Sequence, residues 1–111
     1  MPDDTPLFDT LAAMTLASIE ECDLEPRELM LVRIAALAAV GAPAASYLAN
    51  AGTAVDVGIT LEDVQSTLVA VAPIIGGPRS VQAAGNIARA LGFAIAAVEA
   101  ELDAELDDDG A

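Results

Sequence analysis

The chain has 111 residues, of which 55% are apolar but only 3% aromatic, and its formal net charge is −14. This length suits one domain that can bury a core, and the abundance of small alanines favours closely packed helices over a sheet. Residues 1–28 and 99–111 carry −7 each, whereas residues 29–98 sum to zero. The acidic ends argue against nucleic acid or an anionic membrane as a partner, because like charges repel.

Capping residues, prolines and glycines divide the chain into five predicted helices. Thr5 caps the first helix, which we expect to end near Glu21 or Cys22. The second begins at Pro26 and stops at Gly41. Glu28 stands where the acid of a capping box belongs.

The remaining three helices follow from the same signals. The third is predicted from Pro43 to Gly58, and the fourth starts at a Thr60 cap with Asp63 completing a capping box. The fifth opens at Pro78, after a break at two glycines, and its apolar residues recur every three or four positions as far as Leu102.

The sequence contains no linker and no internal repeat. We therefore expect a single domain over residues 1–111, with a core at about 24–106 and a frayed acidic tail at 107–111. The lone Cys22 allows no intrachain disulfide, and the acidic first residues lack the basic start of a signal peptide, so we expect a cytoplasmic protein. Residues 34–55 are uncharged, but their glycine, proline and polar residues argue against a membrane span.

The middle of the chain is too apolar to be covered by its own polar residues. Residues 29–98 hold only six charged side chains. Because monomers rarely expose large apolar patches, we expect a homo-oligomer, with neither nucleic acid nor a membrane as a partner.

A small polar patch interrupts the alanine-rich third helix. Ser46 and Asn50 lie one turn apart on one face, and Tyr47 borders that face. Such groups most often bond to backbone or water at a helix contact, and the alternative is a pocket wall that binds a neutral or acidic small molecule. Arg33, in an otherwise apolar helix, needs a carboxylate partner or binds an acidic substrate.

Three ordered elements resemble a known family. They are Leu24-Glu25-Pro26-Arg27-Glu28-Leu29, then Ala54-x-x-x-Gly58-x-Thr60-x-Glu62-Asp63-Val64, and then Gly76-Gly77-Pro78 followed by Ala83, Ala84, Ile87 and Ala88. Their order and spacing are similar to those of the carboxymuconolactone decarboxylase family, within the alkyl hydroperoxidase D-like superfamily. The resemblance implies an all-α fold and assembly as a homotrimer or homohexamer. Glu28 matches the element that opens the family's second helix, where a carboxylate most often only favours the helix dipole, and the alternative is a proton relay to the pocket.

The chain departs from both enzyme branches of that family. In the redox-active branch a Cys-x-x-Cys pair followed by His occupies the third helix, and those positions fall on Pro43, Ser46 and Asn50. The chain contains no histidine, which the decarboxylase branch normally carries in this region. The resemblance therefore implies a degenerate active site and no thiol peroxidase activity.

Together these observations lead to two functional hypotheses. The first is acid/base chemistry on a small molecule, such as decarboxylation or lactone turnover, with a small organic acid as the ligand. Its catalytic residues would be Glu28, Arg33 and Asn50, and Ser46 and Tyr47 would bind the substrate. The second is a non-catalytic homo-oligomeric scaffold or ligand-binding module. No cofactor is expected, and no metal, because the helical middle lacks ligand-spaced carboxylates.

Overall fold

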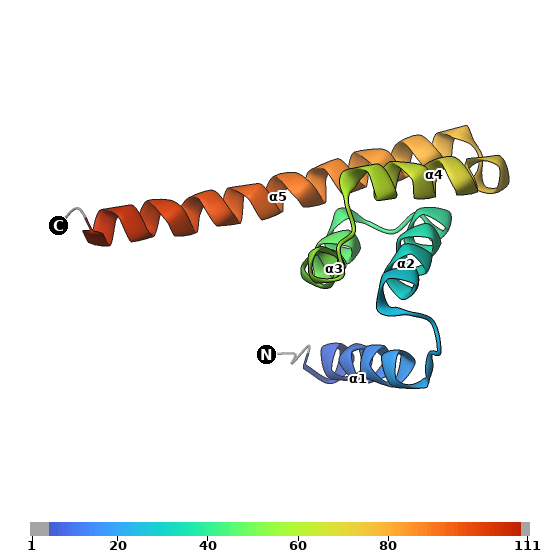
Figure 1. The fold of residues 1–111 in the computed structure, drawn as a ribbon, viewed down its shortest axis with the longest axis horizontal. Helices are drawn as coiled ribbons and strands as arrows, with labels where there is room; N and C mark the ends of the chain where they lie inside the picture. The colour runs from blue at the N-terminus through green and yellow to red at the C-terminus, as the bar shows by residue number, and fades with distance from the viewer. Residues whose placement is uncertain (1–4, 110–111) are drawn as a thin grey trace.

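The computed structural model describes the backbone of residues 5–109 and, in that range, every side chain except those of residues 93–98 and 106–109. This part of the chain consists of five helices without a strand, which confirms the predicted all-α class. They are α1 (Thr5–Glu21), α2 (Pro26–Val40), α3 (Ala44–Asp56), α4 (Leu61–Ile75) and α5 (Gly77–Asp109), shown in Figure 1.

The helix ends follow the local signals closely. Pro26 opens α2, and Gly41 ends it in the left-handed conformation, with φ of 72°. The N–H groups of Gly41 and Ala42 donate to the carbonyls of Ala38 and Leu37, which satisfies the end of the helix. Glu28 stands in the first turn of α2 at the predicted position, but no side-chain capping bond forms there, because the N-cap residue is Glu25. A glutamate at that position is a poor substitute for the short hydroxyl side chain that a capping box needs.

Helices α2 to α5 form the packed body. In Figure 1, α4 and the first half of α5 run side by side, with α2 and α3 packed beneath them. Two polar contacts attach the corner between α2 and α3 to α5: Arg79 Nη1 donates to the Ala39 carbonyl at 2.7 Å, and Asn86 Nδ2 donates to the Ala42 carbonyl at 3.2 Å. The buried apolar residues are Met30, Ile34, Ala38, Ala42, Tyr47, Ala83 and Ala90. Four of these seven are alanines, so the helices approach closely around a small core.

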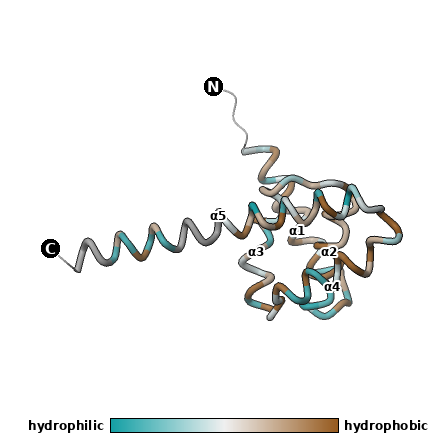
Figure 2. Tube along the Cα trace, turned by 90° about the horizontal axis from the view of Figure 1, so that it is seen from above, coloured by the Kyte–Doolittle hydropathy of each residue, from teal (hydrophilic) through white to brown (hydrophobic). Residues whose placement is uncertain are grey.

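Two segments lie outside this body. Helix α1 has no buried residue and packs against none of the other described helices. The C-terminal part of α5 extends well beyond the other helices in both Figure 1 and Figure 2. Helix α5 also continues through Asp109, so residues 107–109 are helical where the sequence predicts fraying, because extending an existing helix is much easier than starting one. The rest of that predicted tail, residues 110–111, lies outside the described residues.

None of the helices in the described range has both the length and the apolar character that crossing a membrane requires.

Candidate functional site

A cavity of about 270 Å³ lies between α2, α3, α4 and α5. Its wall is almost entirely apolar, and α3 contributes the small side chains of Ala51 and Ala54 to it. The residues that line it are Ile34, Leu37, Tyr47, Asn50, Ala51, Ala54, Val55, Ile59, Thr60, Leu61, Val64, Ile87, Ala90 and Leu91. An apolar cavity with few polar groups is the usual form of a small-molecule site.

Tyr47 is the most unusual residue of this wall. It sits in the first turns of α3, is only 7% exposed, and belongs to a core cluster with Ala42 and Ala90. Its hydroxyl is buried and has no hydrogen-bond partner among the described residues. Burial raises the pKa of the Tyr47 phenol above its ordinary value of 10.0, so the hydroxyl keeps its proton at neutral pH. A buried hydroxyl without a partner costs about 1–3 kcal/mol, so this group is a strong indication of a missing partner.

Asn50 is the second polar residue that lines the cavity from α3. Its Nδ2 donates to the Ser46 carbonyl, one turn earlier, at 2.9 Å. This bond orients the carboxamide and leaves Oδ1 without a donor among the described residues. Ser46 itself is half-buried but does not line the cavity, so it acts here through its backbone carbonyl.

The two charged residues predicted for the site lie elsewhere. Glu28 is exposed in the first turn of α2 and does not line the cavity. Arg33 is half-buried on α2, and its Nη2 donates to Ser18 Oγ of α1 at 3.2 Å. The structure therefore brings Tyr47 and Asn50 together at the cavity and leaves Glu28 and Arg33 outside it.

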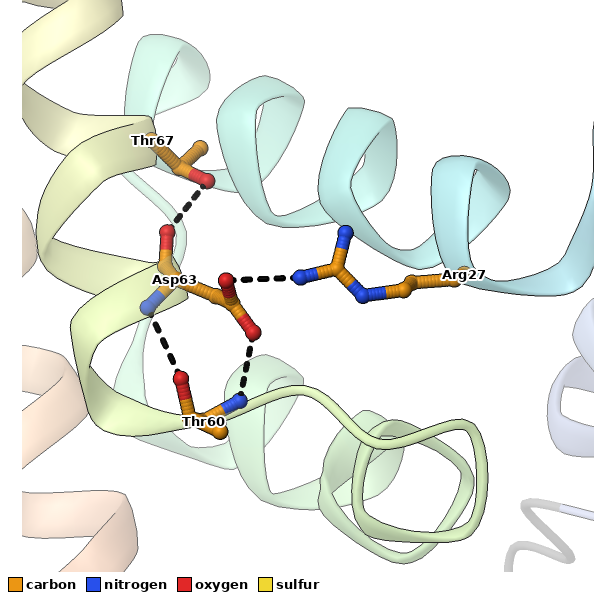
Figure 3. A network of polar contacts seen from close by, with 4 residues as sticks. All are labelled: Arg27, Thr60, Asp63 and Thr67. Atoms are coloured by element: carbon orange, nitrogen blue, oxygen red, sulfur yellow. Dashed lines mark hydrogen bonds and ion pairs between the residues drawn. The ribbon is translucent and has the colours of Figure 1, made fainter.

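A polar network holds the part of the wall where α4 begins (Figure 3). Thr60 Oγ1 accepts from the Asp63 N–H at 3.1 Å, and the Asp63 carboxylate accepts from the Thr60 N–H at 2.9 Å, which confirms the predicted capping box. Arg27 of α2 forms an ion pair with Asp63 at 2.6 Å. The Thr60 N–H is the main reason why the pKa of Asp63 is lowered, and Arg27 adds to it. The network attaches the cavity residues Thr60 and Leu61 to α2.

The apolar wall itself was not predicted as a site. Ile34, Leu37, Ile87 and Leu91 appear in the sequence only as helical stripes, which are typical of any core. What distinguishes them is that alanines stand opposite them on α3, and only the packing of the helices shows that. The sole cysteine, Cys22, lies between α1 and α2 and is not part of the wall. No cluster of three potential metal ligands occurs among the side chains that the structure describes.

The carboxymuconolactone decarboxylase family model matches residues 5–90 of the chain. Neither the curated proteins nor the solved structures contain a match.

Proposed function

The chain belongs to the carboxymuconolactone decarboxylase family, and from this premise we propose that its cavity binds a small uncharged molecule with an apolar body and one hydrogen-bonding group. The observation that carries the proposal is the buried Tyr47 hydroxyl without a partner. The hydroxyl oxygen has almost no accessible surface in the free protein. A ligand carbonyl or hydroxyl that displaces a neighbouring wall side chain would give it the hydrogen bond that the fold does not supply. Asn50 Oδ1 offers a second bond to a ligand that carries a donor.

The size of the cavity limits the ligand. Its volume of about 270 Å³ lies just below the range of about 300–1,000 Å³ that is usual for small-molecule sites. This corresponds to a single substituted ring rather than to a cofactor or a chain. The wall carries no charged side chain among the residues that line it, and burying an unpaired carboxylate there would be very unfavourable. The cavity therefore favours a neutral ketone, lactone or alcohol over a small organic acid.

The same wall favours binding over chemistry. Among the described residues that line the cavity, Tyr47 alone is ionisable, and its raised pKa keeps the phenol protonated at neutral pH, where it donates a hydrogen bond. No lining residue is suited to accept the proton that general base catalysis would remove. Thiol peroxidase chemistry also lacks its nucleophile in the cavity, because Cys22, the only thiol of the chain, does not line it. A ligand-binding module is thus the better supported of the two functional hypotheses.

The chain offers a direct assay because Tyr47 is its only tyrosine and it has no tryptophan. We would titrate the tyrosine emission with three compounds built on one ring: cyclohexanone, methylcyclohexane and cyclohexanecarboxylate. Cyclohexanone should change the emission saturably, with a dissociation constant on the order of 1 mM for so small a molecule. Methylcyclohexane should bind more weakly, and cyclohexanecarboxylate at least about tenfold more weakly because its charge is buried.

A matched pair of variants on α3 tests the location. Ala51→Leu fills the cavity, whereas Ala49→Leu adds the same side chain at an exposed position of the same helix. The first should abolish the cyclohexanone response and the second should preserve it. An unsaturable response, equal binding by both variants, or tighter binding of the carboxylate would contradict the proposal.

A further inference from the structure

Helix α1 is the least supported element of the fold. All of its 17 residues are exposed, and it packs against no other described helix. Arg33 of α2 donates a hydrogen bond to Ser18 of α1. A helix of this length is only marginally stable alone in water. Its stability must come from a surface that one copy of this fold does not provide.

One side of α1 is strongly apolar. Leu7, Leu11 and Met14 follow one another at intervals of one turn, and Phe8 and Ile19 continue the same side. The exposed fractions of these five side chains lie between 45% and 61%. Burying these five side chains against another surface would remove apolar area from water and stabilise the helix. We therefore infer that this face of α1 binds a partner surface.

A matching surface lies at the mouth of the cavity. Val55, Leu61 and Leu91 line the cavity and are also exposed, at 73%, 59% and 41%. The cavity is therefore open on a side that is rimmed by large apolar residues. A lid of apolar side chains would cover this rim and separate the cavity from solvent.

We propose that α1 of one copy lies across the cavity mouth of a second copy, in a reciprocal exchange that closes both cavities. A helix of 17 residues is about 25 Å long and about 10 Å wide, so half of its surface is about 400 Å². Two such helices and the two surfaces that they cover bury about 1,600 Å² in total, which is the size of a standard stable interface. A one-way contact would bury half of that and fall below this size, which is why the exchange is reciprocal.

The charges set the direction of the helix on its partner. Helix α1 carries acids at Asp9, Glu20 and Glu21 and no basic residue. Arg89 precedes the cavity residue Ala90 and forms no ion pair or hydrogen bond with any described residue. Asp56 and Glu62 stand next to Val55 and Leu61 on another part of the rim. The acidic end of α1 therefore lies toward Arg89 of the second copy, and its uncharged residues 10–19 lie over Val55 and Leu61.

The oligomeric state of the full chain is the first test, by sedimentation velocity at micromolar concentration. The wild-type chain should form pairs, or a six-subunit assembly made of three pairs. Leu11→Glu should yield a monomer with a folded body, because α1, which carries Leu11, packs against no other described helix. Ala13→Glu, on the opposite side of α1, is the charge-matched control and should assemble normally. A wild-type monomer, or an unchanged assembly of Leu11→Glu, would overturn the proposal.

The position of α1 is tested separately by cross-linking in a Cys22→Ser background. A mixture of Met14→Cys and Val55→Cys chains should form a disulfide between copies on mild oxidation. A mixture of Ala13→Cys and Val55→Cys chains should not. Equal yields in the two mixtures would show that α1 covers another surface. The readout is independent of any ligand, so its failure leaves the proposed binding function standing.

Charge reversal tests the direction. Arg89→Glu should weaken the pairing by about twofold to fivefold, as expected for one exposed ion pair. Combining it with Glu20→Arg and Glu21→Arg should restore the affinity, whereas no restoration would contradict the assigned direction.

Discussion

Replacing Tyr47 with phenylalanine removes a single oxygen atom from the wall of the cavity. The ring would keep its contacts with Ala42 and Ala90. The buried hydroxyl has no partner among the described residues, and leaving such a group unpaired costs about 1–3 kcal/mol. We therefore expect Tyr47→Phe to be more stable than the wild type in the absence of ligand, although most core substitutions destabilise.

The size of this effect can be measured by thermal unfolding. For a domain of 111 residues the entropy of unfolding is about 0.23 kcal/mol/K, so each kcal/mol raises Tm by about 4 °C. Circular dichroism at equal protein concentration should show an increase of about 4 °C or more. Saturating cyclohexanone should then stabilise the wild type more than the variant, because only the wild type gains a hydrogen bond. A variant with a lower Tm than the wild type would show that the hydroxyl has a partner in the folded protein, and would refute the reasoning.

Three further predictions concern the frame around the cavity. The pKa of Asp63 is lowered in the folded protein from its ordinary value of 3.8, so its contribution to stability is present above that pH and disappears as the pH falls through the lowered pKa. Asp63→Asn should consequently lose less stability than the wild type between about pH 6 and pH 3 in urea unfolding, and equal losses would contradict this. Gly41→Ala should destabilise by about 1–2 kcal/mol because of the left-handed backbone, and its new Cβ would lie 3.3 Å from Gln82 Oε1. Gly52→Ala, inside α3 with open space around it, should stabilise by about 0.5–1 kcal/mol, so effects of the same sign would be inconsistent with the structure. Asn86→Ala removes the bond from α5 to the Ala42 carbonyl and should cost about 1 kcal/mol, measured by the same unfolding assay.

Local signals in the sequence were sufficient to predict the helices. Gly41 and the pair Thr60 and Asp63 act within one turn of the chain, so their effects do not depend on the rest of the fold. Glu28 shows the limit of such signals, because its capping role depended on a neighbour, Glu25, that lacks the required hydroxyl. The family can likewise be predicted from the order and spacing of short sequence elements, and the family-model match over residues 5–90 confirms it.

Only part of the candidate site can be predicted from the sequence. Tyr47 and Asn50 stood out as polar residues in an alanine-rich helix, and both line the cavity. Glu28 is predicted from its match to the family's second helix, and Arg33 from its place in an otherwise apolar helix. Neither signal contains the rotation of α2 in the packed fold, which leaves both residues outside the cavity. The cavity depends on side-chain volumes from four helices at once, and the stripe pattern of one helix contains no such information.

The most direct measurement is a crystal structure of the wild-type chain soaked with cyclohexanone. We expect the ring inside the cavity beside Ala51 and Ala54, with its carbonyl oxygen accepting a hydrogen bond from Tyr47. A cavity that contains no ligand at saturating concentration, or a Tyr47 hydroxyl bonded to another group of the protein, would contradict it.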